Sequence, residues 1–292
     1  MSEYLTTKEL AELLRIKERK VYDLAATGEI PCSRAMGKLL FPRAAVEAWL
    51  ASASSGLDRA GEVQSRPNVF LGSHDPLLDW ALRESGCGLA TYFDGSLDGL
   101  ERFAAGEGIA SGLHIYEPAA KQWNKPAVVD LFAAAPVVLV EWAWRERGLI
   151  VAPDSKRQFK KMADLAGARI VPRQAEAGAQ KLLTHLLLAE GLAADSLTFT
   201  PPVRTESDAA LAVLEGKADA AFGLKSLASQ YRLGFSPIIK ERFDLLIDRR
   251  SWFEPPMRTF LEFCGSKTFG AKLSEIDGYD VGGFGAVHFN GR

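Results

Sequence analysis

Several polar side chains lie between the end of a short apolar run and the start of a predicted helix, and their chemistry suits the binding of a small anion. Ser73 follows the run 69–72, Ser96 follows the run 88–93, and Arg173 follows the run 168–171. The first turn of a helix leaves backbone amides free and carries the positive end of the helix dipole. A serine hydroxyl or a guanidinium beside such a turn adds a donor, so these positions predict an anion site.

The elements that must position these side chains alternate between strand and helix from residue 68 onward. The pattern predicts buried strands at 69–72, 88–93 and 108–114, with helices between them. Such alternation predicts a parallel sheet, and ligands of these sheets lie outside the carboxyl ends of the strands. Ser73, Ser96 and His114 all fall at that edge.

A second unit of the same kind follows in the sequence. Its strands are predicted at 137–144 and 149–152, paired around a turn at 145–148, and at 168–171, 197–203 and 218–223. Its helices are predicted at 159–165, 178–190 and 208–216, and the segment 237–247 returns the chain to the first lobe, where helices follow at 256–264 and 266–273. Two lobes joined by crossing segments predict an α/β domain with a cleft.

The residues predicted to bind a ligand lie on both sides of this cleft. Arg173 and Gln174 precede the helix that begins at Gly178, so the second lobe presents a guanidinium fork and another set of free amides. The complete predicted set is Ser73, His74, Ser96, His114, Arg173, Gln174, Gly178 and Ala179. The alternative is structural: serines at helix starts commonly cap the helix, and a lone buried histidine is commonly a hydrogen-bonded core residue.

The first 50 residues carry the signals of two short helices and a hairpin. Thr6 and Glu9 have the spacing of a capping box, and Gly28 stands where a second helix must stop. Two short extended runs around Gly37 predict a hairpin, and Pro42 opens a further helix. Two helices at a tight turn followed by a hairpin predict a winged helix-turn-helix.

Positively charged side chains of residues 1–50 cluster near the helix that is expected to bind in the major groove of DNA. Residues 1–50 hold eight Lys and Arg against seven Asp and Glu, so clustering matters more than the sum. The recognition helix is expected at about 17–26, with its first turn in the major groove. The residues predicted to contact DNA are Lys17, Arg19, Lys20, Tyr22, Arg34 and Lys38. The alternative is an ordinary solvated helix end.

Composition indicates a soluble, cytoplasmic protein without catalytic or metal-binding motifs. The 292 residues are 47% hydrophobic with a net charge of −2, and the longest apolar run, near 133–140, is too short to span a bilayer. Cys32, Cys87 and Cys264 are widely separated, so they predict neither disulfides nor a zinc site. No nucleophile elbow, HExxH or phosphate-binding loop is present, so neither an enzyme nor a cofactor is expected.

Domain boundaries follow from composition. A DNA-binding domain is predicted at 1–50, a small-residue and polar linker at 51–67, and a ligand-sensing domain at 68–292. Within the last, lobe 1 comprises about 68–145 and 237–292, and lobe 2 about 146–236.

Both domains resemble known families. Residues 4–50 resemble the excisionase-type, MerR-like helix-turn-helix family almost end to end. Residues 67–282 resemble the type II periplasmic-binding-protein superfamily, in particular the PBP-like domains related to molybdate-binding proteins. The landmarks are GSHDP at 72–76, GSLDGL at 95–100, His114, GLIVAP at 148–153, PRQAEAG at 172–178 and GKADAAFG at 216–223. The resemblance implies a molybdate- or tungstate-like oxyanion as one candidate ligand.

The sequence also departs from that group, whose members tend to carry Ser-Gly-Thr-Arg where this chain has Ala177, Gly178, Ala179 and Gln180. Lost hydroxyls and a lost cation leave room for another small polar metabolite. The overall prediction is a one-component transcriptional regulator that binds double-stranded DNA as a homo-oligomer and senses a small anion or polar metabolite. The alternatives are a DNA-binding accessory protein with a non-sensing oligomerisation domain, and a two-lobed enzyme tethered to DNA.

Overall fold

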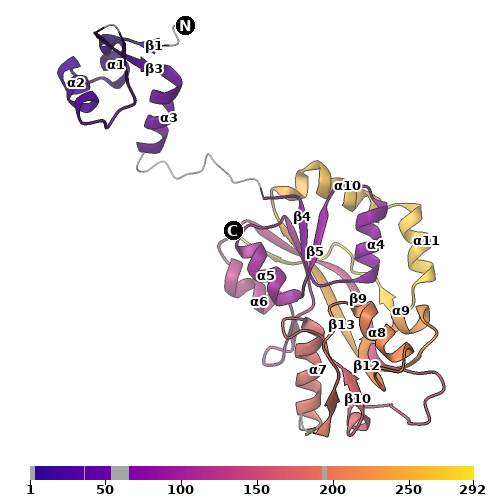
Figure 1. The fold of residues 1–292 in the computed structure, drawn as a ribbon. Helices are drawn as coiled ribbons and strands as arrows, with labels where there is room; N and C mark the ends of the chain where they lie inside the picture. The colour runs from indigo at the N-terminus through magenta and orange to yellow at the C-terminus, as the bar shows by residue number, and fades with distance from the viewer. Residues whose placement is uncertain (1–3, 36, 54–65, 193–195) are drawn as a thin grey trace. The chain divides into compact units, whose positions relative to one another are not determined.

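The computed structural model describes residues 4–35, 37–53, 66–192 and 196–292 (Figure 1). The chain divides into two compact units, residues 1–65 and 66–292. We call the first the head and the second, after the role that the sequence predicts for it, the sensor. Most of the predicted linker, residues 54–65, lies outside the described residues, as does Met36 of the predicted hairpin turn.

In its described residues, the head consists of three helices and a three-stranded antiparallel sheet. Its elements are β1 (Tyr4–Leu5), α1 (Thr7–Leu14), α2 (Glu18–Ala26), β2 (Ser33–Ala35), β3 (Lys38–Pro42) and α3 (Arg43–Ala53), and the sheet order is β1-β3-β2. Thr6 and Glu9 form the predicted capping box at the start of α1. The wing is the β2–β3 hairpin, and the short strand β1, which the sequence did not predict, pairs with β3. Leu10, Val21, Phe41 and Val46 form a fully buried core.

The sensor is built on a ten-stranded sheet that runs through two lobes. Eight strands follow the order β11-β10-β12-β9-β13-β6-β4-β5, and β14 and β15 also pair with β9. The strands are β4 (Val69–Gly72), β5 (Ala90–Phe93), β6 (Ala110–Leu113), β9 (Val137–Val151), β10 (Arg169–Val171), β11 (Thr198–Phe199), β12 (Ala220–Leu224), β13 (Gly234–Asp248), β14 (Tyr279–Asp280) and β15 (Val287–Asn290). A separate hairpin joins β7 (Tyr116–Glu117) to β8 (Gln122–Trp123).

Two long antiparallel strands, β9 and β13, connect the lobes (Figure 1). In lobe 1, β13 pairs through Asp244–Ile247 with β6, and in lobe 2, β9 pairs through Arg147–Val151 with β12. The sequence prediction of a turn at 145–148 is therefore wrong, because β9 continues through these residues without interruption. The partner strand β13 pairs with β9 from Val137 to Val151, with two register shifts, and this backbone pairing holds residues 145–148 in the strand.

Helices cover both faces of the sheet in each lobe (Figure 1). In lobe 1, α4 (Pro76–Glu84), α10 (Pro255–Cys264) and α11 (Lys267–Glu275) pack on one apolar cluster, and α5 (Ser96–Ala104) and α6 (Lys125–Phe132) pack on another. In lobe 2, α7 (Gly178–Ala189) and the 3-10 helix Met162–Leu165 lie on one cluster, and α8 (Glu206–Leu214) and α9 (Lys225–Gln230) on another. A short 3-10 helix, Ser251–Phe253, precedes α10. The predicted helix at 159–165 is thus shorter, and α6 and α9 are additions.

Candidate functional site

Three of the predicted ligand residues meet at the carboxyl edge of the lobe 1 sheet. The hydroxyls of Ser73 and Ser96 lie 2.8 Å apart and share a hydrogen bond, and Ser96 Oγ accepts a second one, of 3.0 Å, from the backbone amide of His114. Neither serine caps a helix, because the N-cap residues of α4 and α5 are Asp75 and Gly95. The capping alternative for these serines is wrong, since the two hydroxyls bind each other and Ser96 also accepts from the amide of His114 at a strand end.

Lobe 2 touches lobe 1 at this same edge, through the start of α7. A methyl group added at Gly178 would lie 2.5 Å from the carbonyl oxygen of His114 and 3.1 Å from Ser96 Oγ. Gln174 donates its side-chain amide to the carbonyl of Asp94 across the boundary, at 3.1 Å. The amide of Leu97 in α5 donates to Glu176, at 3.3 Å. The structure therefore brings Ser73, Ser96, His114, Gln174, Gly178 and its buried neighbour Ala179 together where the lobes are in contact.

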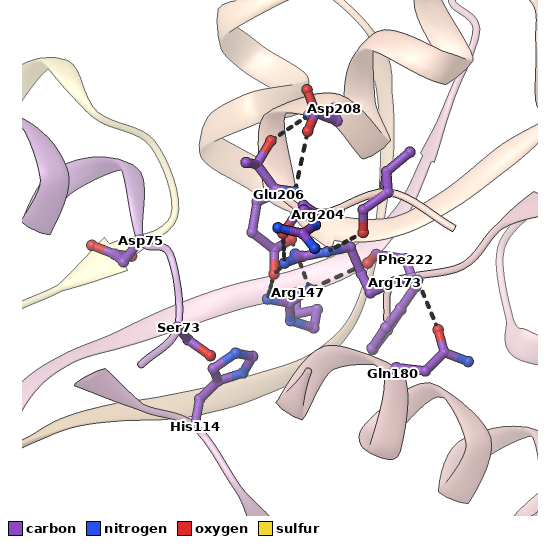
Figure 2. Close-up of polar contacts among 12 residues, drawn as sticks. Ser73, Asp75, His114, Arg147, Arg173, Gln180, Arg204, Glu206, Asp208 and Phe222 are labelled. Carbon is purple, nitrogen blue, oxygen red and sulfur yellow. Dashed lines mark hydrogen bonds and ion pairs between the residues drawn. The ribbon is translucent and has the colours of Figure 1, made fainter. Parts of the chain in front are cut away.

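Arg173 is buried nearby, and its guanidinium binds groups of lobe 2 (Figure 2). It forms a 3.0 Å ion pair with Glu206 and donates to the carbonyls of Val203, at 3.2 Å, and Arg204. Its backbone amide donates to Gln180 Oε1 at 2.9 Å. A guanidinium with this many protein partners has few donors left for a ligand.

Arg173 ends a buried chain of six charges that the sequence analysis did not single out. The chain runs from Asp75 to Arg145 (2.7 Å), Glu241 (2.5 Å), Arg147 (2.8 Å), Glu206 (2.8 Å) and Arg173 (3.0 Å). Asp75 belongs to lobe 1 and Glu206 to lobe 2, whereas Arg145, Arg147 and Glu241 lie on the two connecting strands. Three carboxylates face three guanidiniums, so the chain is balanced in charge, as a buried set must be.

Electrostatics keep Glu206 and Glu241 ionised and the nearby histidine neutral. Burial alone would raise the pKa of Glu206, but Arg147 and Arg173 lower it to about 2. Glu241 is likewise held well below its usual pKa by Arg145 and Arg147, against the effect of burial. Burial lowers the pKa of His114, although its Nδ1 lies 3.2 Å from Glu241. His114 therefore acts as a neutral hydrogen-bonding residue, stacked on Phe243.

A signal for this chain is present in the sequence, in the pattern of β9. Arg145 and Arg147 alternate in β9, with apolar residues before and after the charged run 145–147, and Glu241 has a similar position in the partner strand. Charges inside a strand that is buried on both faces require partners of opposite sign. The prediction of a turn at 145–148 concealed this pattern, because turns place charges in solvent.

A cavity of about 500 Å³ opens beside the charge chain, between the lobes. Lobe 1 contributes α4 with the preceding His74, lobe 2 contributes Ser207 of α8 and Ser226 of α9, and the end of α11 with the segment after it closes one side. His74 is the one predicted ligand residue in its lining. Asp75 and Glu206, the neighbours of His74 and Ser207, belong to the charge chain, so cavity and chain are adjacent.

The predicted DNA contacts lie on the surface of the head. Lys17 is the N-cap residue of α2, and Arg19, Lys20 and Tyr22 follow within its first turns. Arg34 and Lys38 lie on the two strands of the wing. All six side chains are exposed, as a surface that contacts a nucleic acid requires.

Comparison with known proteins agrees with this architecture. The sequence model of the PBP superfamily domain matches residues 80–265, more than half of the chain. The chain belongs to the PBP superfamily. A helix-turn-helix domain matches residues 4–54, so this PBP superfamily protein carries a DNA-binding type of domain at its head.

Relatives of this PBP superfamily chain include proteins without an assigned role. An uncharacterized protein of Bacillus subtilis (strain 168), YvgK, is 26% identical over 296 residues and is covered over 94% of both chains. An uncharacterized protein of Clostridium pasteurianum, from the 5′ region of a ferredoxin gene, is 29% identical over 76 residues, 26% of this chain and 67% of its own.

Solved structures with a similar arrangement share little sequence with the chain. An OxyR mutant of Corynebacterium glutamicum with bound H2O2 has a TM-score of 0.48 at 13% identity, covering 93% of this chain and 91% of its own. The P235GK mutant of ArgBP from T. maritima has a TM-score of 0.46 at 13% identity, covering 71% of this chain and 91% of its own. The effector-binding domain of QuiR in complex with shikimate has a TM-score of 0.45 at 13% identity, covering 70% and 95%. Similarity at this level carries no functional argument.

Within the described ranges, no helix combines the length and the hydropathy needed to cross a membrane. The same part of the chain contains no group of three or more His, Cys, Asp and Glu side chains arranged to hold a metal ion.

Proposed function

We propose that this protein is a one-component transcription regulator in which the head binds DNA and the sensor binds a small polar metabolite between its lobes. The observation that carries the proposal is the fusion of a helix-turn-helix domain to a PBP superfamily domain whose two lobes line a common cavity. The family matches favour a regulator over an enzyme, because they describe a DNA-binding type of domain and a domain of a binding-protein superfamily.

DNA recognition is assigned to α2 and the wing. The first turn of α2 presents Lys17, Arg19 and Lys20 to solvent, and the wing adds Arg34 and Lys38. These groups suit a helix in the major groove and a hairpin along the phosphates. One head of this size makes few phosphate contacts, so we propose that two or more copies read paired half-sites.

Ligand sensing is assigned to movement between the lobes. The two connecting strands link the lobes, and their pairing is irregular at Pro237/Ile239 and Phe243/Asp244, where we place a hinge. The close approach of α7 to His114 and Ser96 marks a closed arrangement. A ligand shifts the balance between closed and open states only if it binds one of them better. A cavity lined by both lobes meets that condition, because part of its wall is lost when the lobes separate.

DNA binding by the head can be tested on genomic fragments selected by the full-length protein. The double variant Arg19→Ala, Lys20→Ala should bind the selected fragment more weakly and lower the slope of log K against log salt by about 2, since each lost phosphate contact removes roughly 0.9. The control, Lys156→Ala with Lys160→Ala, removes two exposed charges from the sensor and should leave both quantities unchanged. Equal affinities for the wild type and the head variant would refute the assignment of α2.

A further inference from the structure

We infer that the cavity between α4 and the pair α8 and α9 binds a small metabolite that is uncharged and rich in hydrogen-bonding groups. This inference rests on the proposed function, since it names the ligand class of the sensor. The sequence predicted an anion from the strand-end serines and Arg173, whereas we infer an uncharged ligand. The evidence is the set of polar groups that line the cavity and the charges around it.

Two neutral groups in the cavity lining have unused hydrogen-bonding capacity. Ser226 is 7% exposed and its Oγ has no hydrogen-bond partner of good geometry, although the hydroxyl lies close to that of Tyr279. Nδ1 of His74 is also buried without a partner. A buried polar atom without a partner costs free energy, and a rotation of either side chain toward the cavity would let a ligand with hydroxyl or amide groups recover that free energy. Ser226 lies in lobe 2 and His74 in lobe 1, so one small molecule can engage both lobes.

The charged side chains of the lining already have partners of opposite sign or a hydrogen bond. Arg83 pairs with Asp79 at 2.7 Å, and Lys272 lies 3.7 Å from Glu275. The carboxylate of Asp277 accepts a 2.6 Å hydrogen bond from Ser229. Two cations against three carboxylates give the lining no excess of positive charge with which to hold an anion. The carboxylate in excess, that of Asp277, is exposed to solvent and would attract a cation only weakly.

The groups behind the lining are also balanced. Burial lowers the pKa of His74, so its imidazole is neutral near pH 7. The next residue in the sequence, Asp75, is the first of the six buried charges, in which three carboxylates pair with three guanidiniums. A charged ligand that left water for this cavity would find no uncompensated opposite charge at its buried end, and desolvation of an ion without such a partner is strongly unfavourable.

The size and remaining surface of the cavity agree with this ligand class. A volume of about 500 Å³ lies within the range of small-molecule sites. Pro76 and Trp80 supply apolar surface from α4, and Ser207 and Gln230 supply further neutral polar groups from lobe 2. A metabolite of the size of a sugar, with several hydroxyl groups and one less polar face, fits this lining.

The inference can be tested with three pools of a bacterial metabolite extract, separated by ion exchange into neutral, anionic and cationic fractions. We expect the neutral pool to raise the Tm of the full-length protein and the charged pools to leave it unchanged. Ser226→Ala should weaken the apparent affinity for the neutral pool about 2- to 10-fold, through the loss of one hydrogen bond. Ser207→Trp should abolish the response by filling the cavity, whereas Ser274→Ala, an exposed serine on α11, should respond like the wild type.

Each of the other outcomes would contradict the ligand class, the location of the site or the sensing function. A Tm shift caused by the anionic or cationic pool and lost in Ser207→Trp would overturn the neutral ligand class and leave the sensor function standing. A neutral-pool shift that persists in Ser207→Trp would place the ligand outside this cavity and overturn the inference as well. If no pool shifts the Tm while genomic fragments are still bound, the sensing part of the proposed function fails, and the inference fails with it.

Discussion

Glu206 is the residue through which lobe 2 joins the buried charge chain. It is 1% exposed and binds two guanidiniums, Arg147 of the connecting strand β9 and Arg173 of its own lobe (Figure 2). Removing one member of a buried ion pair lowers the stability more than replacing both members by apolar residues, because the partner charge remains buried without compensation. Glu206 is therefore expected to matter first for stability.

Glu206→Gln should lower the free energy of unfolding by about 3–5 kcal/mol, since it leaves an unbalanced positive charge in the interior. The matched control is Asp219→Asn, which removes a carboxylate from the exposed pair with Arg169. That pair lies in solvent, so its loss should cost less than about 1 kcal/mol. Urea unfolding followed by tryptophan fluorescence measures both changes. Equal losses for the two variants would contradict a special role for the buried chain.

The contribution of Glu206 should also depend on pH. Its pKa is lowered in the folded protein, from about 4.5 to about 2, so its stabilising effect is complete above pH 4.5 and is lost as the pH falls towards 2. Glutamine mimics the protonated acid at every pH. The difference in unfolding free energy between the wild type and Glu206→Gln should therefore shrink between pH 4.5 and pH 2, as measured by urea unfolding in a series of buffers. A difference that stays constant over this interval would show that Glu206 is not ionised in the native state.

The start of α7 is the element that holds the lobes in contact. Gly178 approaches the carbonyl of His114 too closely for any side chain, and Leu97 in α5 donates its amide to Glu176 just before the helix. Both contacts join lobe 2 to lobe 1. A small change at this helix start should therefore alter the balance between closed and open lobes without disturbing either core.

Gly178→Ala should force α7 away from lobe 1, because the added methyl group would lie 2.5 Å from the His114 carbonyl oxygen. We expect faster hydrogen exchange at the Leu97 amide and a loss of about 1–3 kcal/mol of stability from overpacking. Gly270→Ala is the control: it lies within α11 with open space around it, and it should be neutral or stabilise by up to about 1 kcal/mol. Unchanged exchange at Leu97 would argue against the closing contact.

The head and the sensor each have a hydrophobic core of their own. Leu10 belongs to a cluster formed within the head, and Leu245 to a cluster formed within lobe 1 of the sensor. Both side chains are fully buried. Two units with separate cores can lose stability independently, because mutations that share no partners have additive effects.

Leu10→Ala should destabilise the head by about 2–5 kcal/mol and abolish binding to a selected genomic fragment, while the sensor retains its own unfolding transition. Leu245→Ala should act in the opposite sense, lowering the stability of the sensor and leaving hydrogen exchange in α1 and α2 unchanged. Hydrogen exchange read peptide by peptide distinguishes the two units in the intact chain. Loss of protection in both units from either substitution would show that they unfold as one.

Local sequence determined the head, the alternation of elements in the sensor and the positions of the strand-end side chains. The capping box of Thr6 and Glu9, the stop at Gly28 and the apolar spacing of the helices are short-range signals, and short-range physics suffices for them. The matches to a helix-turn-helix domain and to the PBP superfamily confirm the two types of domain that these signals predicted.

Tertiary structure alone decided how buried charges are distributed. Whether Arg145 and Arg147 lie in a solvent-exposed turn or inside a strand depends on β13, which pairs with β9 from about a hundred residues further along the chain. The same pairing brings Glu241 between them and leads the chain to Glu206 and Arg173. The local sequence predicts that Arg173 binds an anion, but in the structure its guanidinium pairs with Glu206. Burial favours such ion pairs, and only long-range contacts can form them.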